Sequence, residues 1–245
     1  MPGRVTTNVT ITGRIAEPLA HLAALGGAPP GISEAAGEAA SEAVGALVDE
    51  FVPVASRGGW FPSPCRGRPE PLNHAAAFGA ALIRLHDLDG SQRWLQRAHD
   101  VAEWWRGATF RDRSGSLVWR YDPTPRRRRG RTPELVWKAA VTVHFLALAA
   151  DREIGIGAED LDEVRATLMR NVFRDGAVAA TIGADRERIE VFGGARGGAA
   201  ALMPLVELGG EVRGAVEGMV ASDPGLGGWL AHPHGLVGYA HRLGD

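Results

Sequence analysis

The sequence predicts an all-α fold built from antiparallel helix hairpins, with only minor β-hairpins. Apolar residues recur every three to four positions over 72–86 and again over 94–105, which is the period of an amphipathic helix. Asp89 breaks the pattern between these segments, and Ser91 can cap the second one. The segment 134–150 is apolar nearly all round, which is typical of a helix buried on more than one side.

The N-terminal part of the chain is expected to hold a first helix pair. Residues 4–15 contain β-branched side chains and could be extended, but the stretch is too short to define a strand. Helical patterns follow over 15–25 and 33–52, and Ser33 is the candidate N-cap of the second helix. Residues 58–69 are rich in proline and glycine, which predicts an aromatic loop around Trp60 and Phe61.

A short extended segment is expected before the apolar helix over 134–150. Its alternating side chains, predicted to share one face, are Leu117, Trp119 and Tyr121. Thr132 can then act as an N-cap, with Pro133 at the first helical position and Glu134 in the first turn. These three residues predict that the helix begins here.

The remainder of the chain continues the helical pattern. An amphipathic helix is expected over 161–172, and alternating residues predict a β-hairpin over 175–192. Further helices are predicted over 199–208, 211–220 and 236–243. Because no low-complexity linker divides the sequence, we expect residues 1–245 to form a single domain.

The charge of the chain excludes partners that bind through a strong electrostatic field. The 245 residues include 27 Lys and Arg and 29 Asp and Glu, a formal net charge of −2, so nucleic acid is not an expected partner. Hydrophobic residues make up 45%, and their runs end well before the ~20 residues that cross a bilayer. A single cysteine, Cys65, and the lack of a secretory leader predict a cytoplasmic protein.

Two stretches resemble proteins with an (α/α) toroid fold. Residues 73–105 read NHAAAFGAALIRLHDLDGSQRWLQRAHDVAEWW and resemble a toroid helix hairpin. Residues 118–155 contain VWRYDPTP and RTPELVWKAAVTVHFLALAADREIG. They resemble the segment in which uronate epimerases and polysaccharide lyases of this architecture carry Trp-x-Tyr and then Pro-Glu-Asp-x-Ser-His-Ala. The two stretches cover roughly a third of the chain.

The resemblance implies a partial (α/α) toroid, but the chain departs from the family pattern at three positions. The matching residues are Trp119, Tyr121, Pro133, Glu134 and Ala139. Leu135, Trp137 and Lys138 stand where the pattern has Asp, Ser and His. The role of the family histidine is therefore either lost or transferred to an amine. One fold hosts many reactions, so the resemblance favours an architecture more strongly than a chemistry.

Lys138 is the leading candidate for a catalytic base. It is the only lysine of the chain and lies in an apolar helix, where an amine is costly unless it is paired. Glu134, one helical turn earlier, would orient it, and Tyr121 would serve as the acid. The alternative is a Lys138 stem that lies along the helix with its amine at the solvent edge. The resemblance adds His74, because the N-terminal ends of inner toroid helices border the central cavity.

Four further residues are candidates for substrate binding. Trp60, Trp119 and Trp137 offer flat aromatic surfaces, although aromatic residues belong more often to a core. Arg131 could hold an anionic substituent, whereas the run 126–129 is either an anion site or a solvated loop.

No metal or cofactor is predicted. His232 and His234 have no third ligand nearby in the sequence. The glycine-rich stretch 193–198 does not fit a dinucleotide or phosphate-loop pattern.

These residues predict an enzyme of the epimerase, lyase or cyclase-isomerase type, acting on a sugar-like or secondary-metabolite substrate by proton abstraction next to a carbonyl. A first alternative is a non-catalytic ligand- or partner-binding protein on a degenerate toroid scaffold. A second is the processing of a terpenoid or polyketide intermediate by shape and aromatic stabilisation. The expected partners are a small-molecule substrate and, at most, a second copy of the chain.

Overall fold

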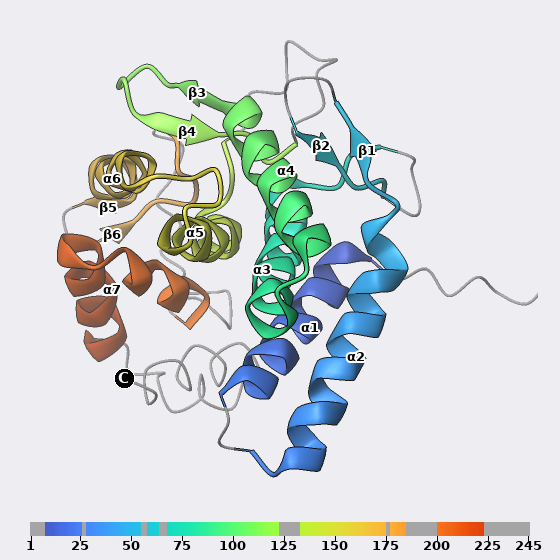
Figure 1. Ribbon diagram of the computed structural model, residues 1–245. Helices are drawn as coiled ribbons and strands as arrows, with labels where there is room; N and C mark the ends of the chain where they lie inside the picture. The colour runs from blue at the N-terminus through green and yellow to red at the C-terminus, as the bar shows by residue number, and fades with distance from the viewer. Residues whose placement is uncertain are drawn as a thin grey trace, which may run out of the picture. The chain divides into compact units, whose positions relative to one another are not determined.

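The computed structural model describes residues 8–25, 28–54, 58–63, 68–122, 133–174, 177–184 and 200–222. Within these ranges the chain is mostly helical, with three small two-stranded antiparallel sheets (Figure 1). The predicted predominance of α-helix is therefore confirmed. Over the same ranges, no helix combines the length and the apolar character that a membrane crossing needs.

Contacts within the chain gather into two compact units. Unit 1 comprises Met1–Ala108, Tyr121–Arg131 and Leu148–Gly157, and unit 2 comprises Thr109–Arg120, Thr132–Ala147 and Ala158–Asp245. The organisation of residues 1–245 as a single domain stays a prediction.

The first helix of unit 1, α1 (Val9–Ala24), begins earlier than the sequence predicted. The Asn8 side chain caps it by accepting a hydrogen bond from the Thr10 backbone N–H at 2.7 Å, so residues expected to be extended are helical. At Gly13 a Cβ atom would lie 2.5 Å from the backbone of Ala77. Only glycine allows α1 to approach this closely.

The second helix, α2 (Pro30–Val48), is capped by Pro29 and has proline at its first position. The prediction that Ser33 is the N-cap is therefore wrong, because the helix begins three residues earlier. Strands β1 (Val52–Pro53) and β2 (Gly59–Trp60) then pair, with Val52 opposite Trp60. The segment expected to be an aromatic loop thus begins with a strand.

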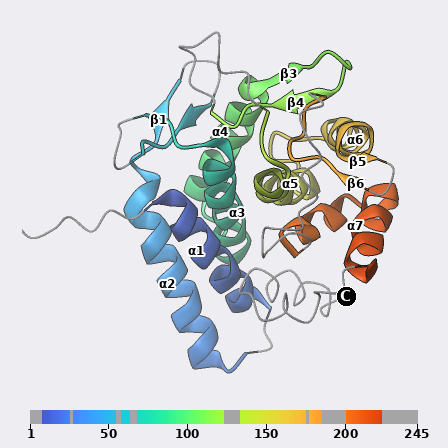
Figure 2. The same cartoon turned by 180° about the vertical axis from the view of Figure 1, so that it is seen from behind.

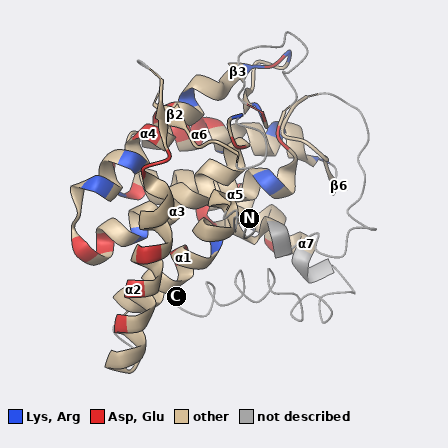
Figure 3. Cartoon of the chain, turned by 90° about the vertical axis from the view of Figure 1, so that its right-hand side faces the viewer, with Lys and Arg blue, Asp and Glu red and all other residues tan. Residues whose placement is uncertain are grey.

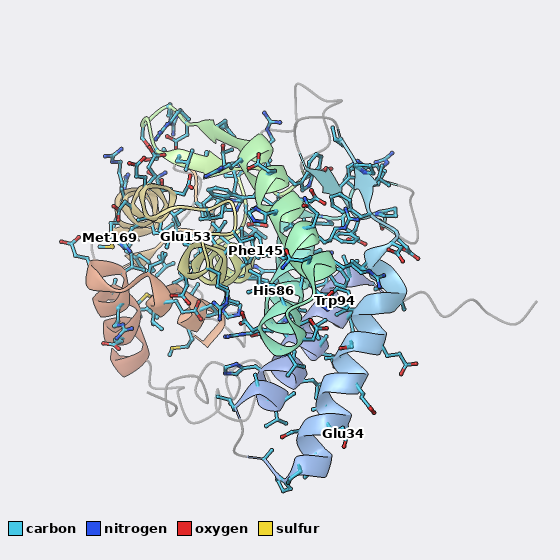
Figure 4. The ribbon with its side chains drawn as sticks, in the orientation of Figure 1. Glu34, His86, Trp94, Phe145, Glu153 and Met169 are labelled. Atoms are coloured by element: carbon cyan, nitrogen blue, oxygen red, sulfur yellow. The ribbon has the colours of Figure 1, made fainter. Side chains whose placement is uncertain are left out.

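Helices α3 (Leu72–Asp89) and α4 (Gln92–Ala108) form the predicted hairpin. The break falls at Gly90, whose φ of 71° is left-handed, a conformation that glycine adopts at little cost. Asp89 closes the turn, because its carboxylate accepts from the Ser91 N–H at 2.8 Å and from the Trp94 indole at 2.9 Å. His86 and Trp94 mark this end of the hairpin in Figure 4.

Unit 2 begins with strands β3 (Thr109–Arg111) and β4 (Leu117–Trp119), where Thr109 pairs with Trp119. The predicted alternation to Tyr121 stops at Trp119 in the structure. Helix α5 (Val136–Asp151) follows, and most of its residues in unit 2 are buried, including Phe145, which Figure 4 labels. Helix α6 (Ala158–Thr167) runs into a π-helix, η1 (Leu168–Val172).

The last described elements of unit 2 are short. Strands β5 (Phe173–Arg174) and β6 (Ala177–Val178) pair. The second half of the hairpin predicted over 175–192 lies outside the described residues. The 3₁₀-helix η2 (Ala200–Leu208) and helix α7 (Gly210–Ser222) occupy two predicted helices. The back view shows α5, α6 and α7 from the opposite side (Figure 2). The predicted helix 236–243 lies outside the described residues.

Candidate functional site

The N-terminal end of α3 in unit 1 carries a histidine–carboxylate pair. His74 Nδ1 lies 2.6 Å from Glu70 Oε2, and the two residues are one helical turn apart. The Glu70 side chain is 3% exposed and that of His74 is 23% exposed. A buried carboxylate therefore holds an imidazole that solvent still reaches.

Backbone hydrogen bonds fix this pair in place. The Glu70 N–H donates to the Phe61 carbonyl at 2.8 Å, and Pro62 bridges to Pro69. Pro71 then caps α3, so Glu70 lies immediately outside the helix and His74 in its first turn. A carboxylate at this end of a helix is favoured by the helix dipole.

Two more predicted site residues lie around the same helix end. The Leu72 N–H donates to the main-chain carbonyl of Tyr121 at 3.1 Å. Trp60, half-buried in β2, directly precedes Phe61, whose carbonyl binds Glu70. The structure thus brings the predicted residues His74, Tyr121 and Trp60 to one end of α3.

One oxygen of Glu70 has no hydrogen-bond partner among the described residues. Its Oε1 and the Oδ1 of Asn73, three residues later, are both buried and have no hydrogen-bond partner among the described residues. Glu70 is 3% exposed and Asn73 is 5% exposed. Buried acceptors without donors cost free energy, and native structures rarely keep them without a reason.

Sequence reasoning chose His74 but missed Glu70. A signal was present, because glutamate four residues before histidine is the spacing at which two side chains meet on a helix. Glu70 has a proline on each side, which predicted a loop there. The pairing of Glu70 with His74 was missed for this reason.

A second glutamate, Glu134, occupies the corresponding position in unit 2. The Trp119 indole N–H donates to Glu134 Oε2 at 2.5 Å, and the Thr142 hydroxyl donates to the same oxygen at 2.8 Å. Both Glu134 and Trp119 are 0% exposed. This carboxylate joins strand β4 to helix α5 inside the core of the unit.

The predicted helix start at Glu134 is wrong, because α5 begins at Val136. The Leu135 carbonyl accepts the first helical hydrogen bonds, from Lys138 N–H at 2.9 Å and Ala139 N–H at 2.8 Å. Pro133 forms a β-bridge to Arg120, and Leu135 forms one to Thr181. These bridges keep the chain extended through Glu134, and the predicted cap Thr132 lies outside the described residues.

Lys138 lies at the surface side of α5 and not in its core. The side chain is half-buried, and its Nζ sits 5.0 Å from the ring centroid of Trp137, which is 42% exposed. This is a cation–π contact between neighbours. On the same helix, His144 lies half-buried with its Nδ1 2.8 Å from Glu207 Oε1.

The segments 69–74 and 133–138 share one local architecture, and we call them the Pro-Glu segments. Each has the pattern Pro-Glu followed by a base four residues after the glutamate, as in Glu70 to His74 and Glu134 to Lys138. Each glutamate N–H donates to the carbonyl of a buried aromatic residue. Each segment follows a small β-hairpin and leads into a helix.

The side chains around the two glutamates differ in their ability to donate hydrogen bonds. In unit 2, the aromatic residue is Trp119, and Thr142 lies eight positions after the glutamate. In unit 1, the same two positions hold Phe61 and Phe78. Phe61 and Phe78 pack edge to face, with centroids 4.8 Å apart, and have no polar hydrogen to donate. These two positions therefore cannot repeat the two hydrogen bonds that Glu134 Oε2 accepts, and Glu70 Oε2 contacts His74 instead.

A polar network in unit 2 closes the β3–β4 turn. One oxygen of Asp112 accepts from the hydroxyl and N–H of Ser114 and from the Ser116 N–H, and the other accepts from Asn171 and the Ala184 N–H. Burial works to raise the pKa of Asp112, but these hydrogen bonds, led by the Ser114 hydroxyl, outweigh it and hold the pKa below its ordinary value of 3.8. Both oxygens are occupied by the protein itself, so the network stabilises the fold.

Several predicted positions lie outside the described residues. They are Arg131, the arginine run 126–129, the glycine-rich stretch 193–198, His232 and His234. Where the chain is described, no three His, Cys, Asp or Glu side chains gather as a metal site would require.

In both units of this mostly helical chain, a small β-hairpin leads into a helix through a buried glutamate. Neither a known protein family nor a curated protein matches the sequence.

Proposed function

We propose that the protein is an enzyme that abstracts a proton next to a carbonyl group, in an epimerase, lyase or cyclase-isomerase reaction on a sugar-like or secondary-metabolite substrate. The observation that carries this proposal is the Glu70–His74 pair, in which a buried carboxylate holds a partly exposed imidazole. A carboxylate that orients histidine through Nδ1 leaves the Nε2 lone pair to act as a base.

In the proposed reaction, His74 Nε2 takes the proton, and the electrons of the broken C–H bond pass to the carbonyl oxygen as an enolate. Glu70 stabilises the imidazolium that forms, as the carboxylate of a catalytic triad does. Tyr121 would return a proton to the opposite face in an epimerase, or to the leaving group in a lyase.

This proposal gives the role of base to His74 and not to Lys138. An imidazole held by a buried carboxylate is already oriented, whereas the Lys138 amine rests on an exposed ring. Glu134 is proposed to position Trp119 and α5 through its two hydrogen bonds. The substrate-binding roles predicted for Trp60, which lies in unit 1 with His74, and for Arg131, which lies outside the described residues, remain part of the proposal. Trp119 is 0% exposed in the core of unit 2, so its proposed role is structural.

We further propose that the hairpins belong to a partial (α/α) toroid. Support comes from the repeated order of helix, β-hairpin, Pro-Glu and helix, which occurs once from α2 to α3 and again from α4 to α5. Repetition of one supersecondary unit is the rule that builds such folds.

Solvent deuterium incorporation tests the proposed activity. The full chain is incubated in D₂O with glucuronate- and galacturonate-terminated disaccharides, and the loss of the proton next to the carboxyl group is followed by NMR. We expect incorporation with the wild type and a loss of about 100-fold or more in His74→Gln, because a general base contributes roughly that factor. The matched control is His86→Gln, which changes a histidine at the far end of the same helix.

The result that contradicts the base role is His74→Gln exchanging protons at the wild-type rate. Absence of exchange with every disaccharide would favour the second candidate, a non-catalytic binding protein. The exposed Trp137 ring, 42% exposed beside Lys138, supports that candidate because it offers an aromatic surface. Native mass spectrometry of wild type and Trp137→Ala with the same disaccharides would detect such binding.

A further inference from the structure

Helix α1 presents its large aliphatic side chains to solvent and its small ones to the core. The residues that face α3 and the interior include Gly13, Ala16 and Ala20, of which the two alanines are 0% exposed. The outward row consists of Ile11 at 62%, Ile15 at 56%, Leu22 at 36% and Leu25 at 63% exposed. A helix of a monomer normally buries its large apolar residues.

These four residues form one continuous row. At 3.6 residues per turn they fall within an arc of about 80° and extend along about 21 Å of helix. They are half of the large hydrophobic side chains that are exposed among the described residues. In the back view, α1 lies in front of α3 at the surface of unit 1 (Figure 2). An exposed apolar row of this kind marks an interaction site.

The spacing of the row is compatible with self-association. Pro18 lies at its midpoint, with Ile11 and Leu25 each seven residues away, and Ile15 and Leu22 three and four residues away. Two antiparallel copies of α1 that cross at Pro18 would therefore place Ile11 against Leu25 of the other copy, and Ile15 against Leu22. Such a two-fold contact pairs apolar side chains along its whole length.

The charges around the row also favour this arrangement. Arg14 is the one charged side chain on this face of the described helix α1, and an antiparallel crossing at Pro18 would keep the two copies of Arg14 about 12 Å apart along the axis. A parallel pair would place them side by side, which is unfavourable. The acidic residue of α1, Glu17, lies off this row and pairs with Arg84 of α3. The acidic residues of α2 are Glu34, Glu38 and Glu42, and that helix carries red bands in Figure 3.

We propose that the outward row of α1 is the contact of a homodimer, formed by antiparallel packing of α1 against α1 of a second copy. Four half-exposed aliphatic side chains supply only part of the ~800 Å² per partner that a stable interface buries. The dimer is therefore weak and depends on concentration.

Sedimentation velocity of the full chain, from about 1 μM to about 1 mM, tests this proposal. We expect the wild type to shift from monomer to dimer over this range. Ile15→Glu and Leu22→Glu should each raise the dissociation constant at least about tenfold, because a two-fold contact counts each substitution twice. Val52→Glu is the matched control, since Val52 is also an exposed aliphatic residue of unit 1, on β1, and it should leave the dissociation constant unchanged.

Cross-linking tests the geometry in a Cys65→Ser background. The double variant Ile11→Cys with Leu25→Cys should form a disulfide-linked dimer, whereas Ile11→Cys alone should not. Circular dichroism checks that each variant is folded. A wild type that stays monomeric at every concentration would overturn the proposal, and so would a dimer that Ile15→Glu and Leu22→Glu leave intact.

Discussion

Glu70 and Glu134 occupy equivalent positions in the two Pro-Glu segments, but their carboxylates have different partners. Each donates its N–H to the carbonyl of an aromatic residue and stands two residues before a helix. Around Glu134, Trp119 and Thr142 donate to the carboxylate, whereas Phe61 and Phe78 offer no donor and Glu70 instead contacts His74. The comparison indicates that the hydrogen-bond donors around a buried carboxylate determine its role. A carboxylate with donors from the core stabilises the fold, whereas one without them can orient a histidine.

The largest effect is expected from removing each carboxylate in turn. Glu134→Ala leaves the Trp119 indole and the Thr142 hydroxyl buried without this acceptor, so it should lower the free energy of unfolding by about 3 kcal/mol. Glu70→Ala removes a carboxylate whose Oε2 contacts a partly exposed histidine that water can still solvate, so its cost should stay below about 1 kcal/mol. Urea denaturation measures both, and equal losses would contradict the distinction.

Trp119→Phe isolates the donor that distinguishes the Pro-Glu segment of unit 2 from that of unit 1. It keeps the ring in the core and removes one hydrogen bond to a buried carboxylate, so we expect a loss of about 2 kcal/mol in unfolding free energy. Trp104→Phe is the matched control, because the Trp104 indole nitrogen is buried with no hydrogen-bond partner among the described residues. If both variants lose the same free energy, ring volume and not the hydrogen bond explains the effect.

Asp112→Asn tests a third carboxylate, both of whose oxygens accept hydrogen bonds from the protein. The folded-state pKa lies below the ordinary 3.8, so the ionised form contributes stability above the unfolded-state pKa. That contribution is lost as the pH falls through the folded-state pKa. At pH 7 we expect Asp112→Asn to cost about 1 kcal/mol.

Urea denaturation of wild type and Asp112→Asn from pH 7 to pH 2 shows the pH dependence. The difference should be constant down to about pH 5 and shrink below about pH 4. Asp49→Asn is the control, because Asp49 pairs with Arg93 at the surface, where its side chain is 81% exposed. A difference that grows toward low pH would have the wrong sign for this account.

The smallest effect is expected from Lys138→Met. Methionine keeps most of the side-chain stem, and the amine that it removes is half-buried and contacts an exposed ring. We expect the free energy of unfolding to change by less than about 0.5 kcal/mol and proton exchange to stay within about twofold. If a folded Lys138→Met protein no longer exchanged protons with solvent, the base would be the Lys138 amine and not His74.

The sequence predicted the regular helices well and their first residues poorly. The α3–α4 hairpin was predicted because its periodicity and the break at Asp89 agree. The start of α1 was missed because Val9 and Ile11 favour strand, and the Asn8 cap with the Gly13 contact to α3 overrides that preference. Local propensity gives way to tertiary contacts at such positions.

At the candidate site, sequence reasoning found His74 and Tyr121 but placed the emphasis on Lys138. The start of α5 was predicted too early because Pro133 suits a first helical position. A Cβ at Gly183 would lie 2.5 Å from the Pro133 ring, and this packing accompanies the bridge that keeps Pro133 extended. Whether core side chains donate hydrogen bonds to a carboxylate depends on residues distant in the sequence, such as Phe78, eight positions after Glu70. Hydrophobic periodicity alone does not identify these residues.

The most direct measurement compares Glu70→Gln with wild type, following deuterium incorporation and unfolding free energy on the same samples. The amide occupies the volume of the carboxylate but carries no charge to stabilise a protonated His74. We expect proton exchange to fall by about tenfold or more while the free energy of unfolding changes by less than about 1 kcal/mol. An unfolded protein, or a folded one that exchanges protons at the wild-type rate, would contradict the assignment of Glu70 and His74 as the working pair.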